Sequence, residues 1–167
     1  MAMRAVVIAA FGVTAAFPAL AAPERVGWAS YHNERFGYSM AYPSSFLLAR
    51  AEAGNGDGRG FGRRGGPGTV LVWASYEDTP IAADVDGLQS ECSMWPPQYR
   101  VVRANKKPQM AAVSCTAKNG SIIYTKVFRC KDVATQLRFE YPKADSALWE
   151  PVVSEMSASL TGGCGET

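Results

Sequence analysis

The chain has few of the residues that hold metals or act as catalytic bases. It contains one histidine, His32, and four cysteines, none of them spaced as a Cys-x-x-Cys pair. Zinc sites draw most of their ligands from such pairs and from histidines. The motifs Gly-x-Ser-x-Gly, Ser-x-x-Lys and His-Glu-x-x-His are missing as well. The sequence therefore predicts no metal site, no cofactor and no catalytic set of residues.

An excess of charge of one sign is also missing. The 17 lysines and arginines nearly balance the 15 aspartates and glutamates, which leaves a net charge of +2. If the first residues are removed with Arg4, 16 basic residues face 15 acidic ones and the net charge is +1. Nucleic-acid binding depends on a strong positive field. We therefore expect no nucleic acid among the partners.

One long apolar run is present, and it lies at the start of the chain. Residues 5–17 follow an arginine and precede the small residues Ala19 and Ala21. A short apolar core between a positive charge and such a pair is typical of a cleaved secretory signal. We predict a signal peptide over residues 1–21 and a periplasmic or secreted domain over 22–167. An uncleaved anchor is the alternative, but no later run reaches the roughly 18 residues of a membrane span.

The region after this run has the patterns of a single α+β domain. Alternating apolar and polar residues predict strands over 28–32, 36–42, 46–51, 69–76, 99–103, 110–116, 121–129 and 134–141. Apolar residues spaced three and four apart predict helices from 78 to about 92 and over 145–160. Because the connections are short, neighbouring strands should be antiparallel. We expect an antiparallel sheet of about six to seven strands flanked by two helices.

The cysteines of this region are expected to form one or two disulfides, because thiols pair in an oxidising compartment. They are Cys92, Cys115, Cys130 and Cys164. The dipeptide Asn119-Gly120 predicts a two-residue hairpin turn, which would place Cys115 opposite Tyr124. Cys130 would then lie about 20 Å from Cys115 along the strand, whereas a disulfide allows about 7 Å between Cα atoms. The pairing of Cys115 with Cys130 is disfavoured, and the other connectivities stay open.

Residues 54–68 are so rich in glycine that we expect a long, mobile loop between two strands. Four larger side chains stand out in this segment: Arg59, Phe61, Arg63 and Arg64. Loops on a rigid sheet often carry recognition residues, and Phe61 is apolar in otherwise polar surroundings. We predict that these four residues contact a partner. Residues 60–65 match a dinucleotide-binding fingerprint formally, but a strand rather than a helix follows them.

Two other features allow a functional interpretation. His32 lies near Glu34 in the sequence and is the one candidate for a catalytic base. A cleft that brings it within hydrogen-bond reach of an acid and a serine would favour a hydrolase. A basic and aromatic cluster also lies in the strand at 99–103 and just after it, and its members are Tyr99, Arg100, Arg103, Lys106 and Lys107. Such lysines usually protect a sheet edge, and a face for an acidic partner is the alternative.

Two segments resemble a known family. Residues 31–43, Tyr-His-Asn-Glu-Arg-Phe-Gly-Tyr-Ser-Met-Ala-Tyr-Pro, and residues 55–59, Asn-Gly-Asp-Gly-Arg, are similar to the opening of small exported bacterial proteins of the PsbP-like superfamily. The stretch from Ile123 to Pro142 and the helix that follows are similar too, so the resemblance spans most of residues 28–160. It implies an antiparallel sheet flanked by helices and a role in binding or assembly. It transfers no catalytic residue.

We therefore expect an exported, non-enzymatic domain that binds a protein or a cell-envelope partner. Two alternatives stay open. One is an envelope hydrolase that uses His32. The other is an inhibitor of foreign secreted hydrolases, because a small domain held by disulfides can present a rigid loop to an enzyme.

Overall fold

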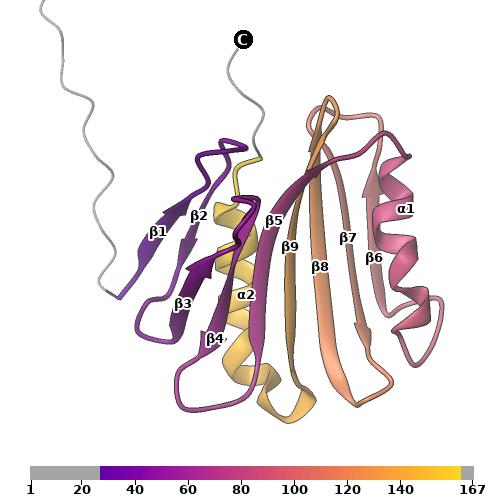
Figure 1. The fold of residues 1–167 in the computed structure, drawn as a ribbon. Coiled ribbons are helices and arrows are strands. Elements are labelled where there is room, and N and C mark those ends of the chain that lie inside the picture. The colour runs from indigo at the N-terminus through magenta and orange to yellow at the C-terminus, as the bar shows by residue number, and fades with distance from the viewer. Residues whose placement is uncertain (1–26, 163–167) are drawn as a thin grey trace, which may run out of the picture.

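The computed structural model describes residues 27–162 and contains one large antiparallel sheet (Figure 1). Its strands lie in the order β3-β4-β5-β9-β8-β7-β6. They are β3 (Leu47–Glu52), β4 (Gly58–Arg63), β5 (Thr69–Tyr76), β6 (Tyr99–Arg103), β7 (Gln109–Thr116), β8 (Ser121–Cys130) and β9 (Val133–Pro142). Two further strands, β1 (Ala29–His32) and β2 (Ser39–Tyr42), form a separate hairpin.

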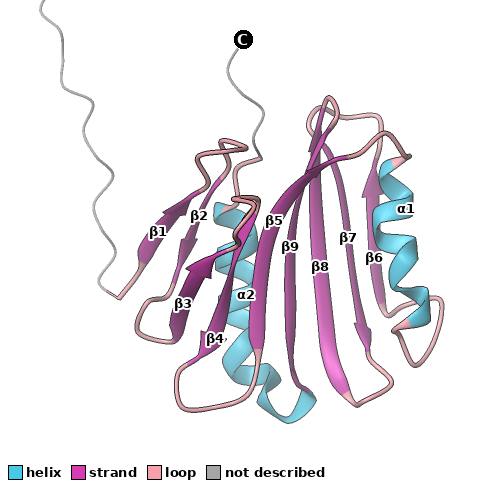
Figure 2. Ribbon diagram, viewed as in Figure 1, coloured by secondary structure: helices cyan, strands magenta, loops and turns pink. Residues whose placement is uncertain are grey.

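Two helices accompany the sheet (Figure 2). The α-helix α1 (Ile81–Asp86) continues into the 3-10 turn η1 (Gly87–Ser90), and the 3-10 turn η2 (Lys143–Asp145) leads into α2 (Ser146–Ser159). The predicted α+β architecture is confirmed. The second helix agrees with its prediction to within one residue at each end, whereas α1 ends before the predicted residue 92 and continues as η1.

The two helices cover opposite faces of the sheet. Ile123 and Val127 of β8 belong to the apolar cluster around α1, whereas Tyr124 packs against the cluster around α2. Successive side chains of a strand point to opposite faces, so α1 and α2 lie on different sides. The α1 cluster draws its sheet residues mainly from β7 and β8, and the α2 cluster mainly from β4, β5 and β9. Each face therefore has one half that its helix does not cover.

The expectation of a mobile loop over residues 54–68 is wrong for the central part of this segment. β4 is a strand that pairs with β3 on one side and with β5 on the other. Its glycines share one face, and at Gly58 a Cβ atom would overlap the carbonyl oxygen of Val72. Glycine thus permits a close approach of the two backbones. Hydrogen bonds to two neighbouring strands offset the poor strand propensity of these residues.

The alternation of β4 also corrects the interpretation of Phe61 as an exposed side chain. Phe61 is 0% exposed, and its ring centroid lies 6.2 Å from that of Tyr31 and 4.8 Å from that of Tyr42. It is a core residue that joins the sheet to the β1–β2 hairpin. A partner could not contact this side chain in the folded domain.

The β7–β8 hairpin differs from its prediction by one residue. Gly120 has φ 84° and closes a three-residue loop, in which the Ala117 N–H donates to the Ser121 carbonyl at 2.7 Å. Cys115 therefore faces Ile123 rather than Tyr124. The expected exclusion of a Cys115–Cys130 bond nevertheless holds.

Cys115 is bonded to Cys92, with 5.7 Å between the Cα atoms. Cys130 is disulfide-bonded as well. Cys164 and the predicted signal peptide over residues 1–21 lie outside the described residues. The disulfide of Cys92 and Cys115 ties the segment that follows η1 to strand β7.

The burial of Phe61 predicts a large loss of stability on its truncation. Phe61→Ala should lower the free energy of unfolding by about 3–5 kcal/mol, because it removes buried apolar area and leaves a cavity. Arg64→Ala, in an exposed side chain of the same segment, should cost less than about 1 kcal/mol. Urea unfolding followed by circular dichroism measures both. Equal effects of the two substitutions would contradict the core position of Phe61.

Candidate functional site

The arginines predicted as partner contacts make polar contacts within the domain. Arg59 and Arg63 point to the same side as Phe61, and both are paired with acids: Arg59 lies 3.3 Å from Glu52, and Arg63 lies 2.6 Å from Asp145. Arg64 is exposed. Arg59 and Arg63 thus connect β4 to its neighbours, and any contact of these arginines with a partner remains a prediction.

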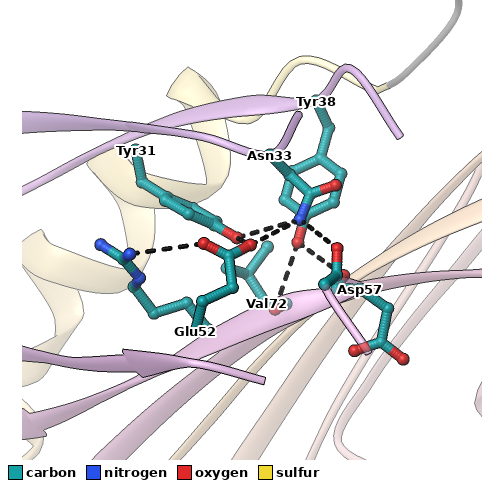
Figure 3. A network of polar contacts seen from close by, with 8 residues as sticks. Tyr31, Asn33, Tyr38, Glu52, Asp57 and Val72 are labelled. Carbon is teal, nitrogen blue, oxygen red and sulfur yellow. Dashed lines mark hydrogen bonds and ion pairs between the residues drawn. The ribbon is translucent and has the colours of Figure 1, made fainter. Parts of the chain in front are cut away.

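A cluster of polar side chains joins the β1–β2 hairpin to the turn between β3 and β4 (Figure 3). Asn33 is 0% exposed and lies at its centre. Its amide nitrogen donates to the Tyr31 hydroxyl at 3.1 Å, to Glu52 at 2.9 Å and to the Gly56 carbonyl at 3.0 Å. Its amide oxygen accepts the Phe36 N–H at 2.8 Å. The amide therefore fixes the turn of the hairpin and attaches it to the β3–β4 turn.

Two tyrosines complete this cluster. The Tyr31 hydroxyl donates to Glu52 at 2.7 Å, and the Tyr38 hydroxyl donates to the Asp57 carbonyl at 3.0 Å. Burial raises the pKa of both hydroxyls, and for Tyr31 the hydrogen bond to Glu52 raises the pKa further. Both hydroxyls stay protonated at neutral pH, and both donate their hydrogen bonds to groups within the cluster. The cluster is therefore a structural joint rather than a site for proton transfer.

His32 lies on the exposed side of the hairpin. Its Nδ1 atom is 2.8 Å from Oγ of Ser39, its cross-strand neighbour, and its Nε2 atom is 3.9 Å from Glu34. The histidine side chain is 50% exposed. The Ser39 N–H points to Thr161 and is not free to hold an oxyanion. A serine is thus within reach, but the acid contact is loose and the imidazole is open to solvent.

Within residues 27–162, no three histidine, cysteine, aspartate or glutamate side chains gather as metal ligands could. None of the described helices is both long and apolar enough to cross a bilayer.

A groove lies on the half of the α2 face that the helix leaves uncovered. It has a volume of about 470 Å³ and is bounded by the sheet on one side and by α2 on the other. Tyr99 of β6 pairs with Ser114 of β7, which pairs with Tyr124 of β8. Paired residues point to the same face. The small serine between two tyrosines leaves a hollow, which accounts for the groove.

The groove contains aromatic rings and neutral hydroxyl groups. Tyr99 is 46% exposed, whereas Tyr141 is held in place by stacking on Trp149 of α2, with 5.2 Å between the ring centroids. Burial raises the pKa of Tyr124 and of Tyr141, so both hydroxyls are neutral at physiological pH. Lys143 and Glu150 are the charged residues of the lining, and their charges balance. The groove therefore suits a neutral, partly apolar ligand.

The sequence singled out Tyr99 but not Tyr124 or Tyr141. Each lies in or at the end of a predicted strand, yet their meeting on one face depends on the register of four strands. Within each strand, the alternation of the sequence shows which residues share a face. Which residues of neighbouring strands lie side by side depends on the lengths of the turns, which the sequence alone did not determine.

The arrangement of strands has a counterpart among solved structures. The solution structure of cyanobacterial PsbP (CyanoP) from Synechocystis sp. PCC 6803 superposes with a TM-score of 0.60 over 87% of this chain and 98% of that one. The fold is PsbP-like. The two sequences are 10% identical, so the likeness concerns the fold alone. It agrees with the fold implied by residues 31–43 and 55–59.

A second solved structure resembles this chain more weakly. A crystal structure from Bacteroides thetaiotaomicron VPI-5482 superposes with a TM-score of 0.46 and 15% identity, over 75% of this chain and 44% of that one. Neither the comparison with protein-family models nor that with curated proteins gave a match.

The central position of Asn33 predicts its effect on stability. Asn33→Ala should cost about 2–3 kcal/mol of unfolding free energy, because buried hydrogen-bonding groups lose their partner. Glu34→Ala, at the adjacent and 94% exposed side chain, should change stability by less than about 0.5 kcal/mol. Chemical denaturation measures both, and hydrogen exchange should show faster opening of β1 and β2 in the Asn33 variant. Similar stability of the two variants would rule out a central role for Asn33.

The buried tyrosines predict a loss of stability at alkaline pH. An unfolded tyrosine loses its proton near pH 10, whereas Tyr38 keeps its proton to higher pH because its pKa is raised in the folded state. The unfolded state then binds fewer protons, so stability falls as pH rises above about 10, by up to about 1.4 kcal/mol per pH unit for each such group. Urea midpoints between pH 8 and pH 11 should fall less steeply for Tyr38→Phe. An unchanged slope in this variant would refute the contribution of Tyr38.

Proposed function

We propose that this chain is an exported binding domain that takes up an extended segment of a protein partner in the groove beside α2. The observation that carries the proposal is the row formed by Tyr99, Ser114 and Tyr124, which runs from the sheet edge to the groove beside α2. The disulfide of Cys92 and Cys115 supports export, because such bonds persist in oxidising compartments.

The chemistry of the groove favours a protein segment. Tyrosine combines a large apolar area with a hydroxyl group and loses little conformational entropy on binding, which makes it frequent at protein interfaces. The lining has one cation and one anion, so the net field that would select a strongly charged partner is weak. Backbone amides and apolar side chains of a partner match the hydroxyl groups and rings of such a groove.

The position of the groove at a sheet edge supports an extended segment. β6 is the last strand of the sheet order, so its outer backbone groups have no strand beside them within the described residues. A partner segment can pair with these groups as an added strand, and its side chains that face α2 would enter the groove beside Tyr99. The backbone would then contribute affinity, and the groove would contribute specificity.

Site-specific cross-linking tests this function. A photoreactive phenylalanine analogue placed at Tyr99 should cross-link one protein of the envelope or exported fraction of the producing cell, identified by mass spectrometry. The same analogue at Leu48 is the control, because Leu48 is 54% exposed but pairs with Gly62 on the opposite face. Cross-links of equal yield and identity from both positions, or none from Tyr99, would contradict the proposal.

A second variant fills the hollow without removing a tyrosine. Ser114→Trp should weaken binding of the identified partner at least tenfold, because the indole occupies the space between Tyr99 and Tyr124. Leu71→Trp, at a 44% exposed position of the other face, should leave the affinity unchanged. Isothermal titration with the partner measures both. A cell-wall glycan is titrated in the same way. If the domain binds the glycan, loses this binding in Ser114→Trp and binds no protein, the groove is a binding site but the proposed class of partner is wrong.

A further inference from the structure

A second cavity lies at the end of the sheet where three connections meet. The connection from β5 to α1, the β6–β7 loop and the β8–β9 turn lie together at the top of the sheet in Figure 1. Two pockets of about 460 and 510 Å³ lie between them. Both are bordered by Ala104, Gln109, Arg129 and Lys131, so we treat them as one cleft with two halves. This cleft is separate from the tyrosine-lined groove.

A buried arginine borders both halves of the cleft. Arg129 is 6% exposed, and its Nη2 atom lies 2.6 Å from Oδ2 of Asp84, an equally buried carboxylate of α1. Its Nε–H has no acceptor among the described residues. A buried donor without a partner costs about 1–3 kcal/mol. The fold thus holds a buried guanidinium at the border of the cleft, paired with Asp84 through Nη2 and without an acceptor at Nε.

The two halves of the cleft differ in the charge of the residues that line them. The half beside the β5–α1 connection is bordered by three acids, Glu77, Asp78 and Asp132. The half beside the β6–β7 loop has no acid in its lining, and its cations are Lys107, Arg129 and Lys131. Asn105 and Gln109 add amide donors to this cationic half. Three cations and two amides border a space of about 510 Å³. Within this set Arg129 is paired with Asp84, and the Gln109 amide donates to the Ala104 carbonyl at 2.8 Å, so Lys107 and Lys131 supply the charge that is left for a ligand.

We propose that the cationic half of the cleft binds a small oxyanion with two or more negative charges, carried by phosphate or carboxylate groups. Oxyanions accept several charge-assisted hydrogen bonds at once, which complements a lining of ammonium, guanidinium and amide donors. The acids of the other half repel a second anion and orient the ligand toward the β6–β7 loop. Lys107 belongs to the basic cluster noted in the sequence, and this site gives that lysine a ligand.

A purely structural role for Arg129 makes a different prediction. In that case its ion pair with Asp84 only anchors α1 to the sheet, and the exposed lysines around it have no common ligand. At anion concentrations too low for a general salt effect, stability would then be independent of the type of anion. The lysines can be removed without touching the buried pair, so the two roles can be separated.

Calorimetric titration of the mature domain tests the site. Pyrophosphate, inorganic phosphate and citrate are titrated at constant ionic strength, with chloride as the reference anion. We expect saturable binding of at least one multivalent oxyanion and a rise in the melting temperature. Binding of pyrophosphate and phosphate but not of citrate would indicate that the site recognises phosphoryl groups. Binding of citrate alone would indicate that it recognises carboxylates. Absence of saturable binding of all three would overturn the proposal.

Matched lysine variants locate the binding. Lys107→Ala combined with Lys131→Ala should raise the Kd at least tenfold and leave the melting temperature without ligand nearly unchanged, because both side chains are exposed. Lys106→Ala combined with Lys118→Ala removes two exposed lysines that border neither half of the cleft and should leave the Kd unchanged. Equal Kd values for the two double variants would overturn the proposal.

Discussion

The pairing of β5 with β9 holds the two halves of this domain together. β3, β4 and β5 form one antiparallel unit, and β6, β7 and β8 form the other. β9 enters between them and pairs with β5 along eight residues and with β8 along ten. α1 lies between the two units in the chain and α2 follows β9. The two helices pack on different faces of the sheet. The tyrosine-lined groove and the cleft at Arg129 both lie beside strands that this pairing positions.

The sequence predicted those features that depend on one segment at a time. The strand at 99–103 has the predicted bounds, and α2 follows from its apolar spacing. β4 was missed because hydrogen bonds to β3 and to β5 stabilise it, and such pairing leaves no trace in the glycine-rich composition of the segment itself. The tyrosine row was missed because a shift of one residue in register reverses every side chain, and the β7–β8 turn differs from its prediction by one residue. The contact of Arg129 with Asp84 joins residues 45 positions apart.

The segments that resemble the PsbP-like superfamily have a structural explanation. Asn33, Tyr38 and Asp57 come from residues 31–43 and 55–59, and their polar groups bond to one another or to nearby backbone. Residues occupied in this way support the fold and contribute nothing to the groove or to the cleft. The similarity of these segments therefore reports on architecture. The groove and the cleft are lined by other residues, whose identity can vary while the fold stays the same.

The three glycines of β4 give one part of the sheet an unusual physical property. Side chains normally shield the hydrogen bonds of a strand on both faces, but on the glycine face of β4 the shielding comes from side chains of the neighbouring strands, among them Arg50 and Leu71. Any local opening of β3 or β5 uncovers this backbone. Amide protons there should exchange with solvent sooner than those of β8 or β9, although all are in regular strands. Since Asn33 attaches the β1–β2 hairpin to the β3–β4 turn, local opening would release both hairpins as one unit. The half of the sheet that carries the groove and the cleft would keep its structure meanwhile.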